Sequence, residues 1–211
     1  MDMVWKILAC VAIGYLLGGW NGAILISRIK MHEDVRKKGS GNAGLTNFLR
    51  SYGGWATLLV VVIDLGKTIL ACWLATLILP EKPELAKMIA GVSIQIGHIF
   101  PVYFGFHGGK GVLSSAAVAV MLDWRIFLIA ISVFILLFFL TRFVSLGSIV
   151  AMCTFAGLTV AFFPDQPFVW GIAILMALIV IVTHRENISR LLHGKERKTY
   201  FHKEKNEREA K

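Results

Sequence analysis

The chain has 211 residues, of which 56% are hydrophobic, and its mean hydropathy is +0.69. A soluble domain of this size cannot bury so large an apolar fraction, so the composition excludes a soluble globular protein and predicts an integral membrane protein in the lipid bilayer. The net charge is +9, but the basic residues flank apolar runs without interleaved aromatic residues, which favours membrane anchoring and predicts no nucleic-acid partner.

Seven apolar runs predict an all-α polytopic fold with about seven transmembrane helices. Three runs are long enough to cross a hydrocarbon core of roughly 30 Å, namely residues 7–27, 55–79 and 144–163. The four shorter runs are residues 85–100, 111–122, 126–141 and 168–183. The first two of these short runs would alternatively form a re-entrant hairpin, which would leave five crossings. The first run lacks a small-x-small cleavage site, so we expect a retained helix and not a cleaved signal peptide.

The distribution of basic residues predicts the orientation. Most of the 22 lysines and arginines fall at residues 28–53, 110, 142 and after 184. This bias places those segments in the cytoplasm, with the N-terminus outside and the C-terminus inside, and an odd number of crossings satisfies it. We expect a single transmembrane domain at residues 1–193 and a solvated, charged cytoplasmic tail at residues 194–211.

The loop after the first run carries the sequence GSGNAGLTNFLR, residues 39–50. Its glycines allow backbone N–H groups to turn toward an anion, and its small polar side chains supply neutral hydrogen bonds. The residues concerned are Gly39, Ser40, Gly41, Asn42, Thr46, Asn47 and Arg50. The pattern therefore predicts an anion-binding loop, with a flexible turn as the alternative.

A second loop carries GHIFPVYFGFHGGKGV, residues 97–112. Lys110 supplies a point charge for phosphate oxygens, and the neighbouring Gly108, Gly109 and Gly111 let the main chain approach closely. A Walker A loop needs Ser or Thr after its lysine and a strand before it, and neither is present. We therefore expect no nucleotide, no cofactor and no obligatory metal. The three cysteines lie in apolar runs and predict neither a disulfide nor a metal site.

The third cluster, THRENISRLLHGKE, follows the last apolar run at residues 183–196. On a helix, His184, Asn187 and Arg190 recur every three residues and share one face. The alternative is a basic juxtamembrane helix lying on anionic lipid headgroups. Asp64 and Lys67 form a further pair at i, i+3 within the second run, and such residues are either functional or neutralise one another.

These motifs resemble those of the bacterial acyl-phosphate:glycerol-3-phosphate acyltransferases, a family of small polytopic membrane enzymes. Its patterns GSGNxGxTNxxR, GHxFPxxxxFxGGKGV and HRxNIxRLxxGxE are met at residues 39–50, 97–112 and 184–196. Leu45 stands where the family more often has alanine, and His107 where lysine is commoner. Thr68 replaces the glycine of the family's DxxKG, which Asp64 and Lys67 otherwise match.

The resemblance implies transfer of an acyl group from acyl phosphate to the primary hydroxyl of glycerol 3-phosphate. The products are lysophosphatidic acid and phosphate, in phospholipid biosynthesis. The site is expected to face the cytoplasm from a bacterial inner membrane, with no obligatory protein partner. The loop around Lys110 would hold the donor phosphate and the first loop glycerol 3-phosphate, and these two assignments are interchangeable. Either His184 or the departing phosphate would accept the proton, and Gly97 and His98 would shape the second loop.

The residues implied as catalytic are His184, Asn187, Lys110 and Ser40. Those implied as substrate-binding are Gly39, Ser40, Gly41, Asn42, Thr46, Asn47, Arg50, His98, Gly108, Gly109, Lys110, Gly111 and Arg190. A transporter of phosphate or glycerol phosphate uses the same anion-binding groups and is the alternative function. A soluble-type acyl-CoA transferase is disfavoured because no histidine has an aspartate five positions later. A structural scaffold would leave the three loops unexplained.

Overall fold

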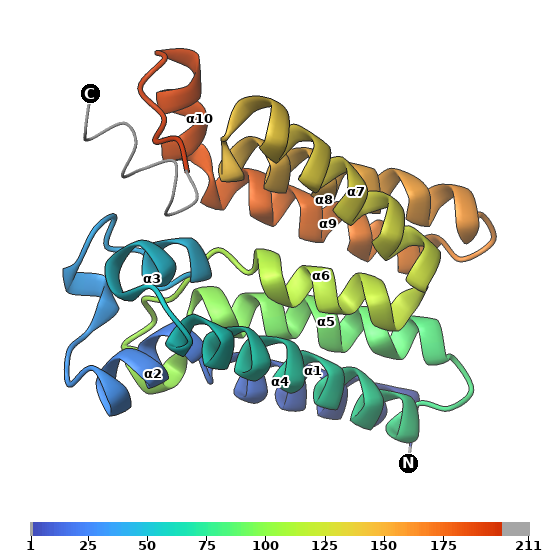
Figure 1. The fold of residues 1–211 in the computed structure, drawn as a ribbon. Helices are drawn as coiled ribbons and strands as arrows, with labels where there is room; N and C mark the ends of the chain where they lie inside the picture. The colour runs from blue at the N-terminus through green and yellow to red at the C-terminus, as the bar shows by residue number, and fades with distance from the viewer. Residues whose placement is uncertain (1, 200–211) are drawn as a thin grey trace, which may run out of the picture.

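The computed structural model describes residues 2–199, and over this range the chain forms helices and loops without a β-strand. Most helices run back and forth between the two ends of one bundle (Figure 1). In chain order they are α1 (Met3–Gly18), α2 (Gly22–Lys30), α3 (Leu45–Tyr52), α4 (Ala56–Ile78), α5 (Pro83–Ile99), α6 (Val112–Leu122), α7 (Trp124–Thr141), α8 (Val144–Phe162), α9 (Pro167–Thr183) and α10 (Arg185–Leu192), with short 3₁₀ turns at Val35–Lys37 and Val102–Phe104.

Apolar helices occupy all seven predicted positions, which confirms the all-α polytopic fold. Among the described residues, five helical segments are long and apolar enough to cross a membrane, and α9 with α10 would make a sixth despite a 60° bend between them. The exception is α6, whose 11 residues rise only about 16 Å. The number of crossings and their orientation therefore remain predictions.

The first apolar run is broken, where the sequence predicted one continuous helix. Helix α1 ends at Gly18, and α2 begins at Gly22 after a short irregular segment. The Asn21 side chain causes the restart, because its Oδ1 accepts a 3.0 Å hydrogen bond from the Ile24 N–H at the N-terminus of α2. The break leaves backbone carbonyls of the intervening segment inside the bundle, where they need partners.

Helix α1 packs closely on α5 through glycines spaced four residues apart. A Cβ added at Gly14 would lie 2.7 Å from the Ala90 carbonyl oxygen, and one added at Gly18 would overlap the backbone at Ile94. Small residues at this spacing allow two membrane helices to approach backbone to backbone. As a result, the loop that follows α2 and the loop that follows α5 emerge side by side.

The second half of the bundle, α7 to α9, lies above α6 in Figure 1, whereas α1, α4 and α5 lie below it. Val118 of α6, Phe155 of α8 and Met176 of α9 are buried in the core of this half. The loops that carry the three sequence motifs all emerge at the end of the bundle where α10 lies (Figure 1). The fold thus gathers segments that are up to about 150 residues apart in the chain.

Candidate active site

A cavity of about 920 Å³ opens at the end of the bundle where the motifs meet. Every residue that the sequence singled out as catalytic or substrate-binding lines it: Gly39, Ser40, Gly41, Asn42, Thr46, Asn47, Arg50, His98, Gly108, Gly109, Lys110, Gly111, His184, Asn187 and Arg190. The fold therefore brings the three motifs together around one cavity. The individual roles of these residues remain predictions.

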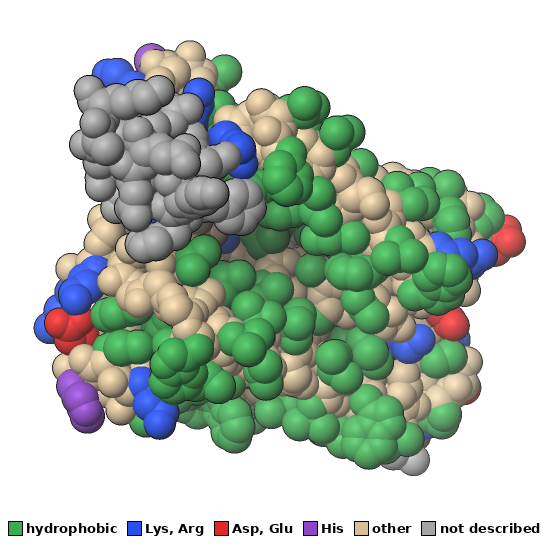
Figure 2. All heavy atoms as spheres, in the orientation of Figure 1, with side chains coloured by type: hydrophobic (Ala, Val, Ile, Leu, Met, Phe, Trp, Pro, Cys, Tyr) green, Lys and Arg blue, Asp and Glu red, His purple; other side chains and the backbone are tan. Residues whose placement is uncertain are grey.

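The cavity has a polar end and an apolar end. Beyond the motifs it continues between α6, α7 and α8, where Ala119, Phe127 and Phe155 are among its lining side chains. Figure 2 shows a recess with hydrophobic side chains between the two layers of helices. Along α8 the lining extends from Val144 to Phe155, a rise of about 16 Å. That is close to half of a hydrocarbon core of roughly 30 Å, the depth of one lipid tail.

The first loop is held in shape by Asn47. Its Oδ1 accepts a 2.9 Å hydrogen bond from the Ser40 N–H, and its Nδ2 donates to the carbonyls of Val35, Lys38 and Asn42 at 3.0–3.2 Å. The amide has no hydrogen atom left for another acceptor. Asn47 therefore stabilises the conformation of the loop through its side-chain amide. A direct contact between Asn47 and substrate remains a prediction.

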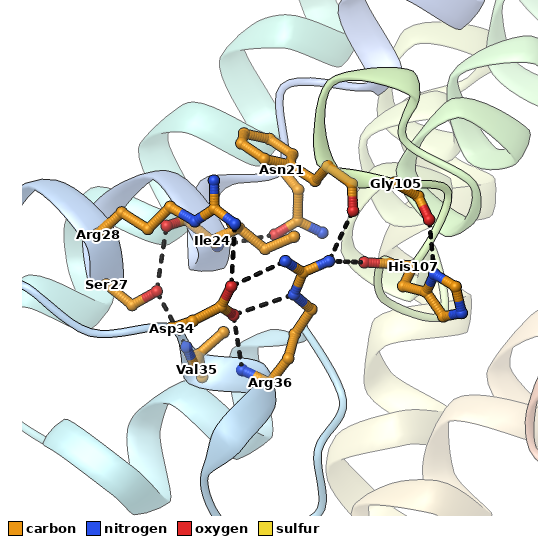
Figure 3. Close-up of polar contacts among 10 residues, drawn as sticks. Asn21, Ile24, Ser27, Arg28, Asp34, Val35, Arg36, Gly105 and His107 are labelled. Carbon is orange, nitrogen blue, oxygen red and sulfur yellow. Dashed lines mark hydrogen bonds and ion pairs between the residues drawn. The ribbon is translucent and has the colours of Figure 1, made fainter.

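Arg36 ties the first loop to the second (Figure 3). Its guanidinium donates to the carbonyl of Phe104 at 2.7 Å and to that of His107 at 3.0 Å, while it pairs with Asp34 at 2.7 Å. The hydrogen bonds from Arg36 hold the pKa of Asp34 well below its usual value, although burial alone would raise it. A second backbone contact, from the Ala43 N–H to the Gly108 carbonyl at 3.3 Å, closes the junction.

The side chains that face the cavity from the first loop are less constrained. The hydroxyls of Ser40 and Thr46 have no hydrogen-bond partner among residues 2–199, which leaves them available to a ligand. Arg50 instead donates to the Thr199 hydroxyl and to the Arg197 carbonyl. A substrate that binds Arg50 must therefore displace or share these contacts.

The second and third motifs meet through Lys110, whose Nζ donates a hydrogen bond to Asn187 Oδ1. Asn187 Nδ2 in turn donates to Glu196 Oε1 at 2.6 Å, and Arg190 Nε donates to Glu196 Oε2 at 2.7 Å. Glu196 also accepts a 2.8 Å bond from the Ser145 hydroxyl of α8. This carboxylate therefore fixes both motif residues of α10 over the glycine loop.

The electrostatics of this cluster leave Lys110 only moderately basic. Burial, and then the charge of Arg190, lower the pKa of Lys110 to about 8. Burial would raise the pKa of Glu196, but hydrogen bonds from Asn187, Arg190 and Ser145 outweigh it and lower the pKa. The charged residues that line the cavity are six cations, Arg36, Arg50, Lys110, Arg185, Arg190 and Arg197, and three carboxylates, Asp64, Glu186 and Glu196. This balance favours an anionic ligand.

The sequence pattern predicted that His184 lies on one helix with Asn187 and Arg190. In the structure it lies just before that helix, at the bend between α9 and α10. It is 4% exposed, and its Nδ1 lies 2.8 Å from the Val180 carbonyl oxygen. Because a carbonyl only accepts, Nδ1 carries the proton and Nε2 is the lone-pair nitrogen. Burial, and then the nearby charge of Lys110, lower the pKa of His184 to about 4.

A buried polar network supports the second loop from within the bundle. The Lys67 ammonium forms an ion pair with Asp64 Oδ1 at 2.7 Å and donates hydrogen bonds to the carbonyls of Gly18 and Trp20 at 3.1 and 3.0 Å. Its Nζ also lies 3.0 Å from His98 Nδ1. Asp64 and Lys67 therefore do more than neutralise one another. Lys67 also donates hydrogen bonds to the carbonyls that the break between α1 and α2 leaves without a partner.

Sequence reasoning missed three residues that shape the site. Asn21 caps α2 and donates to the Ala43 carbonyl, Arg36 bridges two loops, and Glu196 holds the third motif. Asn21 could have been found from the sequence, because it is an asparagine within an apolar run. Glu196 closes the third motif but lies in the segment predicted as a solvated tail. The part of that tail at residues 200–211 lies outside the described residues.

Comparisons with known proteins agree on one family. Residues 8–194 match the family described as glycerol-3-phosphate acyltransferase. A glycerol-3-phosphate acyltransferase of Syntrophomonas wolfei is 38% identical over 190 residues, covering 90% of this chain and 95% of the relative. One of Lactiplantibacillus plantarum is 33% identical over 196 residues, covering 93% of each.

The fold is similar to crystal structures of PlsY (YgiH), an integral membrane glycerol 3-phosphate acyltransferase. The TM-score to its glycerol 3-phosphate form is 0.84, with 32% identity over 92% of this chain and 96% of that one. The TM-score to its lysophosphatidic acid form is 0.81, with 31% identity over 92% of this chain and 95% of that one. With the matched motifs gathered around one cavity, the chain belongs to the glycerol-3-phosphate acyltransferase family.

Proposed function

We propose that the protein transfers an acyl group from acyl phosphate to the primary hydroxyl of glycerol 3-phosphate. The hydroxyl oxygen attacks the carbonyl carbon, the bond from that carbon to the phosphate oxygen breaks, and the hydroxyl proton passes to the departing phosphate. The products are lysophosphatidic acid, here 1-acylglycerol 3-phosphate, and inorganic phosphate. The reaction would take place on the cytoplasmic side of a bacterial inner membrane.

One observation carries the proposal: the polar end of the cavity, which the three motifs line, is continuous with its apolar end. An acyl phosphate has the same division, with a charged head and a hydrocarbon tail. The space between α6, α7 and α8 suits the tail, and the cations Lys110 and Arg190 suit the head. A transporter of phosphate alone has no use for an apolar compartment about as deep as a lipid tail, so this feature favours the acyltransferase.

The chemistry asks little of the protein beyond positioning and charge. Acyl phosphate is a mixed anhydride and is already activated, so the enzyme must mainly orient two anions and stabilise the charge that develops. Lys110, fixed by Asn187, would hold the donor phosphate with the glycine loop. Ser40, Thr46 and Arg50 would bind glycerol 3-phosphate from the facing loop and direct its hydroxyl.

The proposal is tested with purified protein in lipid vesicles that receive acyl phosphate and glycerol 3-phosphate. We expect lysophosphatidic acid and phosphate in equal amounts, and no product when acyl-CoA replaces the acyl phosphate. Product formed with acyl-CoA but not with acyl phosphate would refute the proposed donor. Uptake of glycerol 3-phosphate into vesicles without any acylated product would instead support the transporter.

We predict that His184→Ala slows the reaction less than the loss of a general base would. With a pKa of about 4, His184 is a weak base, whereas the departing phosphate carries an oxygen base beside the bond that breaks. Loss of a general base would lower kcat by about 10²–10⁴-fold and remove an acid limb from the pH profile. We expect a fall of less than 100-fold, with the wild-type profile retained. A larger fall, with unchanged KM and a lost limb, would make His184 the proton acceptor.

A second prediction is that acyl transfer needs neither divalent metal nor nucleotide. Among residues 2–199 no group of three or more His, Cys, Asp or Glu side chains is arranged to hold a metal ion. Wild-type enzyme treated with EDTA and then freed of it by gel filtration should keep its rate. Loss of activity that returns only on adding Mg²⁺ or Mn²⁺ would contradict this expectation.

A further inference from the structure

His98, at the end of α5, presents a buried nitrogen to the cavity. The residue is 4% exposed, lines the cavity and lies against the glycine loop of the second motif. A Cβ added at Gly109 would overlap His98 Nε2, so only glycine allows the loop to pass this close to the ring. The side of the imidazole that bears Nε2 therefore faces the loop that carries Lys110.

The protonation of the ring follows from its neighbours. Lys67 Nζ lies 3.0 Å from His98 Nδ1, and an ammonium group has hydrogens to donate but no lone pair to accept with. Asp64 Oδ1 lies 2.7 Å from the same ammonium and 3.6 Å from Nδ1, too far for a hydrogen bond to the ring. Nδ1 must therefore be the acceptor, and in a neutral ring the proton lies on Nε2.

The N–H at Nε2 has no acceptor within the described part of the chain. Asn21 Nδ2 lies 3.5 Å from Nε2 and is also a donor. The Asn21 amide cannot be turned round, because its Oδ1 accepts from the Ile24 N–H and its Nδ2 donates to the Ala43 carbonyl, both at 3.0 Å. A buried donor without a partner is unfavourable by about 1–3 kcal/mol.

We propose that His98 donates a hydrogen bond from Nε2 to a phosphate oxygen of a bound substrate, and that Asp64 and Lys67 are positioning residues that fix the required tautomer. The assignment rests on the proposed function, since both substrates of that reaction carry a phosphate. At neutral pH most oxygens of a phosphate group are acceptors, and an acceptor is what the N–H at Nε2 lacks. The charge of Asp64 is offset by Lys67, so it does not repel the anion.

The kinetic test compares His98→Leu, which removes the donor, with His98→Gln, which keeps an N–H group. We expect His98→Leu to raise the KM of one phosphate substrate by about 10-fold or more, as expected for a lost hydrogen bond to a charged group. His98→Gln should recover most of the affinity. A rise in the KM of glycerol 3-phosphate alone assigns the contact to the acceptor, and a rise in that of acyl phosphate alone assigns it to the donor.

Ser93→Ala is the matched control on the same helix. Ser93 is also buried, but its hydroxyl bonds to the Ile89 carbonyl, and the residue does not line the cavity. We expect both KM values of Ser93→Ala to stay at the wild-type level. Unchanged KM values in a His98→Leu protein that melts at the wild-type temperature would overturn the proposal. Equal changes in both His98 variants, confined to kcat, would likewise show a purely structural role.

A spectroscopic test needs no variant to turn over. In wild-type protein labelled with ¹⁵N-histidine in lipid nanodiscs, the His98 signal is assigned by its loss in His98→Gln. We expect the proton on Nε2, and we expect that resonance to move when inorganic phosphate or glycerol 3-phosphate is added. A proton on Nδ1, or no response to either anion or to acyl phosphate, would overturn the proposal. If the His98 resonance moves on adding phosphate but the protein shows no acyltransferase activity, the proposed function is refuted and the phosphate contact of His98 still stands.

Discussion

Lys110→Ala should lower kcat/KM by about 10- to 150-fold while the protein stays folded. The ammonium group is the cation of the glycine loop, and a hydrogen bond from a charged donor contributes about 1.5–3 kcal/mol, which corresponds to that range of rates. Asn187 would lose its partner as well, so the third motif would no longer be fixed to the second. Steady-state kinetics in vesicles with both substrates varied would measure the fall.

The matched control is Lys37→Ala, which removes the same charge from an exposed position. Lys37 lies on the same end of the bundle but does not line the cavity, so its loss should change kcat/KM by less than about twofold. Lys110→Arg should recover only part of the rate, because a planar guanidinium is larger and the adjacent glycines shape the loop around an ammonium. Wild-type rates in a folded Lys110→Ala protein would remove this loop from the mechanism.

The helices were predictable because a single physical requirement decides them. A membrane segment must be apolar and must satisfy its own backbone, so apolar runs identify the helices. The break between α1 and α2 was not predictable from hydropathy, because residues 7–27 are apolar almost throughout. Only one side chain, that of Asn21, signals the restart, and its effect depends on a capping geometry.

The composition of the site was predictable, but the division of labour within it was not. Asn47 and Asn42 look equally suited to a ligand in the sequence, yet the amide of Asn47 is spent on the loop itself. The same residue types donate hydrogen bonds to a ligand and to the loop backbone, so the sequence does not distinguish the two roles. Glu196 was missed for another reason: it follows the last helix among mixed charges, and only the fold shows that it reaches Arg190.

The buried pair of Asp64 and Lys67 carries the largest expected effect on stability. Their side chains are 2% and 3% exposed, so removing either one leaves the other as an uncompensated charge inside the bundle. Breaking such a pair is destabilising by about 3–5 kcal/mol. We therefore expect Asp64→Ala and Lys67→Met each to lower the free energy of unfolding by this amount, which would be measured by unfolding the protein in mixed micelles.

The two single variants should not be equal. Lys67 also donates to the carbonyls of Gly18 and Trp20, and burying unpartnered carbonyls adds a further penalty. Lys67→Met should therefore be the less stable of the two. Asp64 has one backbone contact to lose, the 3.2 Å bond that it accepts from the Gly22 N–H.

The double variant Asp64→Ala/Lys67→Met separates charge pairing from the support of the helix break. Removing both charges abolishes the uncompensated ion, so the double variant should be more stable than the sum of the two single changes predicts. It should still be less stable than the wild type, because the carbonyls at the break between α1 and α2 remain without a donor. Strict additivity would mean that the two charges do not stabilise one another. Full recovery would mean that the break needs no donor, and Lys67 would then serve only Asp64 and the imidazole of His98.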